Sequence, residues 1–318
     1  MKLFHETTIK LYSKNELKIC ILSDIHFSYR VKNKKLESLR RKLERRKPDY
    51  IFIPGDLVDS NNMIEKASEE KRLLRWLESL GKIAPTILSE GNHDVYKKTE
   101  KAERKKTGDH WKIYKNSKFE KKVNDLENVF YLDNAVYEDK NVYVLGFTLP
   151  PKAYCLLKAE EPIMKASKTG EDVPEILKAL KKNQKLIKNL PKNKKTFALV
   201  HSPSSLSEES VKSELSEFDF LVSGHMHNGL VTPIFFELWP SDRGIVNAAR
   251  KIAAKNTRLS KSTLKEGLII TGAVTTWHEA VGQFHNLNLL YPSYFTTVKF
   301  INDKKYKKPK VTKKYLKY

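Results

Sequence analysis

Five short motifs in this sequence carry carboxylate, imidazole and amide side chains, which are the groups that bind divalent first-row metals. The motifs are SDIH at 23–26, GDLVD at 55–59, GNHD at 91–94, VHS at 200–202 and GHMH at 224–227. In the last of them, His225 and His227 stand one residue apart after an apolar run. Such a pair alone fits a turn with two solvated histidines as well as a metal site. The choice depends on whether the five motifs meet in space.

The elements around the motifs predict that they do meet. Short apolar runs, read as buried strands, alternate with charged segments of helical periodicity in the first part of the chain. The predicted strands cover 17–24, 50–56 and 85–92, and the predicted helices cover 34–46 and 71–81. This alternation indicates an α/β fold with a parallel sheet covered on both faces.

Further strands are predicted in the second part of the chain. Three closely spaced runs, at 129–132, 135–139 and 141–147, suggest consecutive antiparallel strands. Four more strands are predicted at 196–203, 218–227, 267–274 and 294–300, with a helix at 175–190. Each of the five motifs therefore stands where an apolar run stops.

Ligands of open α/β sheets bind beyond the carboxyl ends of the strands, so the five motifs should converge on one rim. The candidate metal ligands are Asp24, His26, Asp56, Asn92, His201, His225 and His227. Seven groups are more than one ion needs once positions are left open for water. They suit two ions about 3.5–4 Å apart that share a bridging carboxylate.

The motif series D-x-H, G-D-x-x-D, G-N-H-D, H and G-H-x-H resembles that of the calcineurin-like metallophosphoesterase superfamily. It is similar to a bacterial branch in which the last motif continues toward a proline, here GHMHNGLVTP at 224–233. The resemblance implies two mixed β-sheets packed as a sandwich and flanked by helices. Helix-rich segments at about 97–128, 150–195 and 234–264 depart from a minimal version of that fold.

The resemblance also implies a role for each motif residue. One ion would be held by Asp24, His26 and His227, and the other by Asn92, His201 and His225, with Asp56 as the bridge. His93 would be the catalytic acid, oriented by Asp59, and Asp94 would fix the local turn.

These assignments predict a dinuclear metal-dependent phosphohydrolase that cleaves phosphate mono- or diesters by attack of a metal-bridging hydroxide. We favour Mn²⁺, with Fe and Zn²⁺ as alternatives, because the ligand types do not separate these metals. There are two alternative functions. One is a nuclease, and the other is a hydrolase of phospholipid or nucleotide-lipid head groups at a membrane surface. A non-catalytic scaffold has no chemical need for His93 or for a complete ligand set, so both argue against it.

The composition is that of a globular protein with a substantial core. Of 318 residues, 40% are hydrophobic and 31% are charged. We divide the chain into a phosphoesterase domain at 1–302, which includes the three helix-rich segments, and a basic tail at 303–318. The tail offers little that could pack and is expected to be extended or disordered.

The formal charge of +22 would attract polyanions, namely a phosphorylated substrate, nucleic acid or an anionic membrane. The lysines are spread along the chain, however, and a solvated lysine-rich surface explains them as well. Two cysteines, Cys20 and Cys155, form no metal framework. No signal peptide and no run of 18 apolar residues is found, so a cytoplasmic protein is expected, with peripheral membrane attachment as the alternative.

Overall fold

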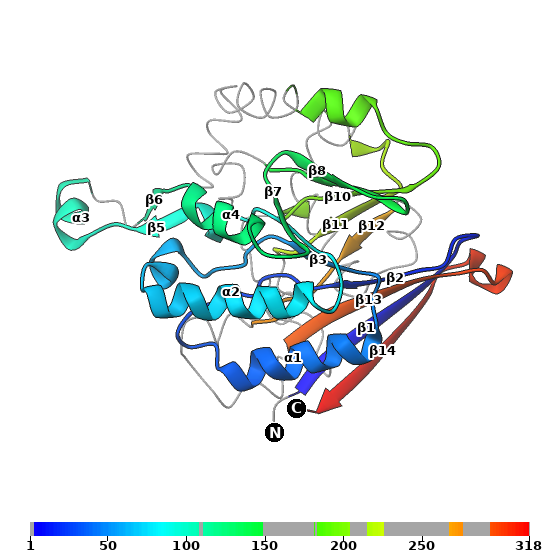
Figure 1. The fold of residues 1–318 in the computed structure, drawn as a ribbon, viewed down its shortest axis with the longest axis horizontal. Coiled ribbons are helices and arrows are strands. Elements are labelled where there is room, and N and C mark those ends of the chain that lie inside the picture. The colour runs from blue at the N-terminus through cyan, green and yellow to red at the C-terminus, as the bar shows by residue number, and fades with distance from the viewer. Residues whose placement is uncertain are drawn as a thin grey trace, which may run out of the picture.

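Two β-sheets packed face to face form the centre of the molecule (Figure 1). The computed structural model describes residues 3–107, 111–148, 181, 183–203, 215–225, 267–275 and 293–317, and every structural statement below concerns these residues. Among them, no helix is long and apolar enough to cross a membrane.

The larger sheet has seven strands in the order β14-β1-β13-β2-β3-β4-β7. Their bounds are Leu3–Tyr12 (β1), Leu17–Ile21 (β2), Tyr50–Pro54 (β3), Thr86–Ser89 (β4), Val129–Leu132 (β7), Ser293–Ile301 (β13) and Lys310–Lys317 (β14). Strands β2, β3, β4 and β7 run parallel, whereas β2 pairs antiparallel with β13. The sheet is therefore mixed, and the three predicted N-terminal strands are its parallel centre.

The second sheet has five strands in the order β12-β11-β10-β9-β8 and is also mixed. Their bounds are Ala135–Glu138 (β8), Val142–Gly146 (β9), Lys195–Leu199 (β10), Phe220–Ser223 (β11) and Leu268–Ile270 (β12). Aliphatic and aromatic side chains from both sheets form one buried cluster between them. The rings of Phe52 and Phe197, one from each sheet, are 5.2 Å apart. The predicted fold class, an α/β sandwich of two mixed sheets, is confirmed.

Helices cover the outer face of the larger sheet (Figure 1). They are α1 (Asn33–Arg46), α2 (Ala67–Gly81) and α4 (Ser117–Asn124). The leucines predicted to line one face of the first helix, Leu36, Leu39 and Leu43, are all buried against this sheet. Burying such side chains contributes roughly 1.5–3 kcal/mol each relative to leaving them exposed.

The expected run of three antiparallel strands is right for β8 and β9 and wrong for β7. Strand β7 pairs parallel with β4 in the larger sheet, where Leu88 stands opposite Tyr131. The chain then turns through Asn134, which has a left-handed backbone at φ 49°, and enters the second sheet as β8. Asparagine tolerates this conformation better than most residues, so the chain can pass from one sheet to the other through a short polar turn.

The segment 97–128 is helical only in part. It contains α3 (Lys101–Thr107) and α4, but also β6 (Trp111–Ile113), which pairs with β5 (Tyr96–Lys98). The hairpin and α3 form an arm that projects from the body (Figure 1). Of the segment 150–195 only residue 181 and residues 183–195 are described, with 183–188 helical, and the segment 234–264 lies outside the described residues. The division into domain and tail remains a prediction.

The basic tail is extended, but it is not loose. After a short 3₁₀ turn at Lys304–Lys307, β14 pairs antiparallel with β1 from Lys10↔Lys310 to Leu3↔Lys317. The tail thus forms the edge of the larger sheet. An edge strand rich in lysine resists pairing with other chains, so the lysines of the tail protect the edge of the sheet. The low hydrophobicity of the tail did not predict this strand.

Deleting residues 303–318 should therefore weaken the fold while sparing the site. We expect the free energy of unfolding to fall by about 1–3 kcal/mol, because a ladder of hydrogen bonds and cross-strand pairs is lost. Strand β1 would become a new edge, so aggregation should increase. Metal-dependent turnover of a small ester by the soluble fraction should stay within about twofold, which enzyme assays and denaturant titration would measure. A variant with Gln at the four lysines of β14 is the control, since it removes charge and keeps the strand.

Candidate metal centre

The carboxyl ends of five parallel strands place the predicted ligands at one edge of the sandwich. Strands β2, β3 and β4 of the larger sheet lead into Asp24, Asp56 and Asn92, and β10 and β11 of the second sheet lead into His201 and His225. Hydrogen bonds join the two sheets at this edge. The backbone N–H of Val274 donates to the carbonyl of Ser23 (2.9 Å), and that of Thr275 donates to the carbonyl of Asp24 (3.0 Å).

Backbone hydrogen bonds also fix the ligand-bearing loops to one another. The carbonyl of Asp56 accepts the N–H groups of Ile25 and His26 at 2.8 and 3.1 Å. The N–H of His225 donates to both carboxylate oxygens of Asp24, at 3.1 and 3.0 Å. Hydrogen bonds among the motifs at 23–26, 55–59 and 224–227 thus fix the positions of these loops in the absence of a bound ligand.

Four of the predicted ligands have left-handed backbone conformations. Their φ angles are 51° at Asp24, 44° at His26, 54° at Asp56 and 66° at His225. Outside glycine such conformations are uncommon and cost on the order of 1–3 kcal/mol each, so they persist only where the surroundings enforce them. The loop hydrogen bonds supply that enforcement, and the bent backbones turn the side chains toward a common centre.

The first cluster of donor atoms comprises Asp24, His26 and Asp56, all at most 2% exposed. Nε2 of His26 lies 3.6 Å from Oδ2 of Asp56 and 4.0 Å from Oδ1 of Asp24. The structure thus brings together three of the four residues predicted around one ion, and the fourth, His227, lies outside the described residues.

The second cluster comprises Asp56, His201 and His225. Nε2 of His201 lies 3.2 Å from Oδ2 of Asp56, 3.1 Å from Oδ1 of Asn92 and 3.3 Å from Nδ1 of His225. Its other ring nitrogen, Nδ1, lies 2.8 Å from the carbonyl of Pro54. A proton held there leaves the lone pair of Nε2 for a metal, as is usual for metal-binding histidines.

Both clusters share one atom, because Oδ2 of Asp56 faces His26 on one side and His201 on the other. Burial raises the pKa of the Asp56 carboxyl, but the imidazoles of His201, His93 and His26 outweigh it and hold the pKa well below the usual value. Burial lowers the pKa of His201, but Asp56 and Asp24 outweigh it and raise the pKa to about 9.

These residues fit a divalent metal. Asp24 and Asp56 bring two carboxylates into a buried space, and buried charges persist only when they are paired or coordinate a metal. Carboxylate, imidazole and amide oxygen are also the appropriate donors. Without a metal, the neighbouring carboxylates favour protonated imidazoles. Metal cations bound at the site would displace those protons.

The predicted catalytic acid lies beside the first cluster. The ring of His93 stands edge-to-face against that of His26, with the centroids 4.5 Å apart, and its backbone N–H donates to Oδ1 of Asp56 (2.9 Å). Its Nδ1 contacts Asp59, as predicted, but through the main-chain carbonyl at 2.7 Å. The carboxylate of Asp59 instead lies 3.9 Å from Nδ1 of His26, so the orienting contact belongs to the backbone.

Comparison with known proteins identifies the family. The family model for calcineurin-like phosphoesterases matches residues 17–229, more than half of the chain. The chain belongs to this family. The match covers all the predicted ligands, including His227. The continuation toward Pro233 lies beyond the match and outside the described residues, so the particular bacterial branch remains a prediction.

Two curated relatives of this calcineurin-like phosphoesterase are uncharacterized metallophosphoesterases. The one from Campylobacter jejuni is 24% identical over 223 residues, covering 70% of this chain and 47% of its own length. The one from Helicobacter pylori is 27% identical over 218 residues, covering 69% and 46%. The chain therefore spans about half the length of the curated relatives it matches. Among solved structures, phosphopantetheinyl hydrolase from Mycobacterium tuberculosis aligns with a TM-score of 0.40 and 13% identity over 66% of this chain and 83% of its own.

Two residues of this phosphoesterase hold the loop that carries His93. The carboxylate of Asp94, predicted to fix the turn, accepts the N–H groups of Gly91 (2.9 Å) and Val58 (3.0 Å) and so confirms that prediction. Asn61 was not predicted. Its Nδ2 lies 2.7 Å from the carbonyl of Asp94 and contacts two carbonyls of the β5–β6 hairpin. Asn61 matches no short motif, and its role depends on a hairpin that the sequence did not reveal.

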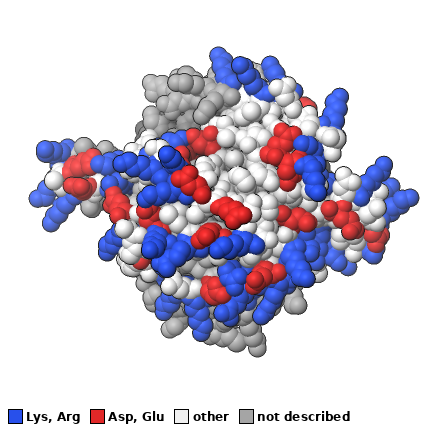
Figure 2. All heavy atoms as spheres, in the orientation of Figure 1, with Lys and Arg blue, Asp and Glu red and all other residues white. Residues whose placement is uncertain are grey.

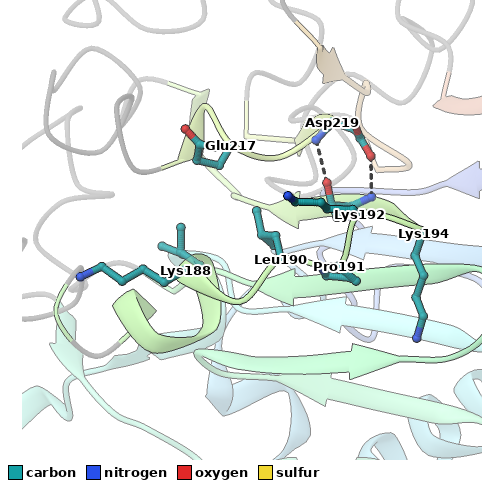
Figure 3. A pocket seen from close by; sticks show the side chains of 9 residues that line it. Lys188, Leu190, Pro191, Lys192, Lys194, Glu217 and Asp219 are labelled. Carbon is teal, nitrogen blue, oxygen red and sulfur yellow. Dashed lines mark hydrogen bonds between the residues drawn. The ribbon is translucent and has the colours of Figure 1, made fainter.

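A separate pocket of about 640 Å³ lies at the opposite end of the second sheet (Figure 3). Its lining includes three lysines, Lys188, Lys192 and Lys194, together with Glu217 and Asp219. Asp219 exchanges two hydrogen bonds of 2.9 and 2.8 Å with Thr196, another lining residue, and these are the dashed lines at Asp219 in Figure 3. Thr196 and Asp219 stand at the amino ends of β10 and β11, so the pocket takes no part in the metal centre.

Gly91 leaves room for the bridging carboxylate. A Cβ atom there would collide with the backbone N and with Oδ1 of Asp56. Gly91→Ala should therefore displace Asp56 and lower metal content and turnover at least about tenfold, by analogy with losses of outer-shell support. Gly81→Ala is the matched control, because its Cβ would collide as closely with the carbonyl of Glu127, away from the site. It should lower stability without lowering the metal content. Equal metal content in both variants would contradict the expectation.

Proposed function

We propose that the protein hydrolyses phosphate mono- or diesters with two divalent metal ions, Mn²⁺ being favoured over Fe and Zn²⁺. The observation that carries this proposal is the position of Asp56, whose Oδ2 faces both His26 and His201. A carboxylate shared by two donor clusters suits a pair of ions better than a single ion. The family match supports a metal-dependent phosphoester hydrolase.

Each part of the site has a task in this reaction. Asp24 and His26 would hold one ion with His227, and Asn92, His201 and His225 would hold the other. When bound, the two ions would neutralise the phosphoryl oxygens and acidify the attacking water. His93, held through Nδ1 by the carbonyl of Asp59, presents Nε2 as the nitrogen that gives a proton to the leaving oxygen.

A substrate panel tests this proposal. Chelated protein reloaded with Mn²⁺, Fe²⁺ or Zn²⁺ should hydrolyse at least one compound from a set of distinct phosphate esters, and metal-free protein should hydrolyse none. The set comprises p-nitrophenyl phosphate, bis-p-nitrophenyl phosphate, cyclic nucleotides, single-stranded DNA and a nucleotide-lipid pyrophosphate. Absence of metal-dependent turnover with every metal would rule out the proposed activity.

Nucleic acid and an anionic membrane surface stay proposals as partners of this basic chain. Acidic side chains stand among the basic ones over most of the face seen in Figure 2. Several lysines are paired, for example Lys112 with Glu103 and Lys122 with Glu70. On this face the charges of the described residues are mixed, so the substrate class has to be inferred from the surroundings of the site.

A further inference from the structure

The segment that follows His26 forms one side of the rim around the metal centre. Phe27 pairs with Val58 in a parallel bridge, and its carbonyl accepts the N–H of Asp59 at 3.2 Å. Tyr29 and Arg30, two and three residues after Phe27, stand at the surface. The side chain of Tyr29 is 65% exposed, and the guanidinium of Arg30 lies 5.3 Å from the centre of its ring.

This exposed pair stands on a rigid base. Arg72 of α2 donates to the carbonyls of Val31 (2.7 Å) and Ser28 (2.8 Å), and its guanidinium lies 4.3 Å from the ring centre of Phe27. These contacts hold the backbone on both sides of Tyr29 and Arg30. An exposed aromatic ring on a fixed backbone is preorganised for binding, because little ordering remains to be done when a ligand arrives.

A second cation, Lys98, belongs to a strand that is hydrogen-bonded to the segment after Asp59. The backbone N–H of Lys98, at the end of β5, donates to Oδ1 of Asn62 at 2.6 Å, three residues after Asp59. Asn61 ties β5 to the same segment through the carbonyl of Tyr96. The side chain of Lys98 is exposed. Both cations therefore stand on segments that are hydrogen-bonded to the stretch 59–62, Arg30 through Phe27 and Lys98 through Asn62.

We infer that Tyr29, Arg30 and Lys98 form a subsite for the leaving group, and that this leaving group carries a second phosphate and a planar ring. The inference rests on the proposed function, in which His93 protonates the leaving oxygen. Donor atoms of Asp59, His26 and His93 lie within 4.8 Å of one another, so the segments around Asp59 border the side of the site on which His93 stands. The ions neutralise the reacting phosphoryl group, so further cations on this side match a further anion.

The residue types agree with this substrate class. A guanidinium binds a phosphate through two parallel hydrogen bonds, and a lysine adds a mobile point charge. A tyrosine ring with an arginine beside it is a surface on which a nucleobase stacks. A nucleotide whose scissile ester and second phosphate lie on the same sugar satisfies both requirements. A phosphorylated lipid head group supplies the anion without the ring.

The first test compares two substrates with the same scissile ester. Adenosine 3′,5′-bisphosphate and adenosine 3′-monophosphate both release their 3′-phosphate, but only the first leaves a product with a second phosphate. With the Mn²⁺-loaded protein we expect kcat/KM to be at least about tenfold higher for the bisphosphate, the factor given by one charge-assisted hydrogen bond. Arg30→Gln and Lys98→Gln should each reduce this ratio, and Lys140→Gln should leave it unchanged. Lys140 is an exposed lysine between β8 and β9, at the amino end of β9 and opposite the metal edge.

The ring is tested by Tyr29→Ala. Fructose 1,6-bisphosphate carries two phosphates but no planar ring, so the preference of the wild type for the adenosine compound over it should fall about fivefold or more in the variant. If the wild type favours the sugar bisphosphate, the inference that the leaving group carries a planar ring is wrong. A phosphorylated head group without a ring would then be the better substrate class. Equal kcat/KM for the two adenosine compounds would overturn the subsite.

Equilibrium binding separates this inference from the proposed activity. If no ester is hydrolysed, the proposed function fails, but calorimetric titration of the Mn²⁺-loaded protein with the two adenosine compounds still decides the subsite. Tighter binding of the bisphosphate that is lost in Arg30→Gln and Lys98→Gln would support it. Equal binding, or equal weakening in Lys140→Gln, would overturn it.

Discussion

Asp56→Asn should abolish most of the activity and much of the metal binding together. Asp56 is the residue that both donor clusters share, and its side chain is 1% exposed. A neutral amide of the same shape can still accept the N–H of His93, but it presents only one oxygen and no charge to two cations. The stabilisation that metal ions supply in such reactions is worth several kcal/mol, so kcat should fall by about 10³-fold.

Elemental analysis of metal per chain and initial rates on one small ester measure both effects. Asp139→Asn is the matched control. Its carboxylate accepts hydrogen bonds from the hydroxyl of Tyr50 and the N–H groups of Asn141 and Val142, at the end of the sheet away from the site. That variant should lose stability and keep its metal. Full metal content with full turnover in Asp56→Asn would remove Asp56 from the reaction.

The position of the site follows from the sequence because of one general property of parallel sheets. Every ligand motif comes directly after an apolar strand, and the carboxyl ends of neighbouring parallel strands meet at one edge. Strand prediction at β2, β3, β4, β10 and β11 was therefore enough to bring Asp24, Asp56 and His201 together over more than 170 positions of the chain. The prediction of two mixed sheets came from the resemblance to the family, since a run of apolar residues predicts a strand but not the sheet to which the strand belongs.

The parts that sequence reasoning missed depend on long-range pairing. The N-terminal strand β1 alternates poorly and was not predicted, yet it lies between β13 and β14 in the larger sheet. The C-terminal segment forms a strand only because β1 offers it an edge. The left-handed backbone conformations of Asp24 and His225 also cannot be predicted from the sequence, since neither residue is a glycine. They are held by hydrogen bonds between loops that are distant in the sequence.

His93→Ala should keep its metals and lose most of its turnover of esters with poor leaving groups. The hydrogen bond from residue 93 to Asp56 comes from the backbone, so it survives the substitution and the bridging carboxylate stays in place. Only the imidazole is lost. General acid catalysis is worth about 10²–10⁴ in rate, and this is the expected fall in kcat for an alkyl phosphate ester. The loss should be much smaller for a p-nitrophenyl ester, since p-nitrophenolate departs without a proton.

The comparison with Asp59→Asn tests the geometry of this acid. Because the carbonyl of Asp59, and not its carboxylate, contacts Nδ1 of His93, the amide variant keeps the orienting contact and should lose far less turnover than His93→Ala. A loss as large as that of His93→Ala would show that the carboxylate, which lies 3.9 Å from His26, is needed in its own right. If His93→Ala slows alkyl and p-nitrophenyl esters equally, proton transfer is not its task. His93 would then bind the phosphoryl group, and the leaving oxygen would take its proton from another donor.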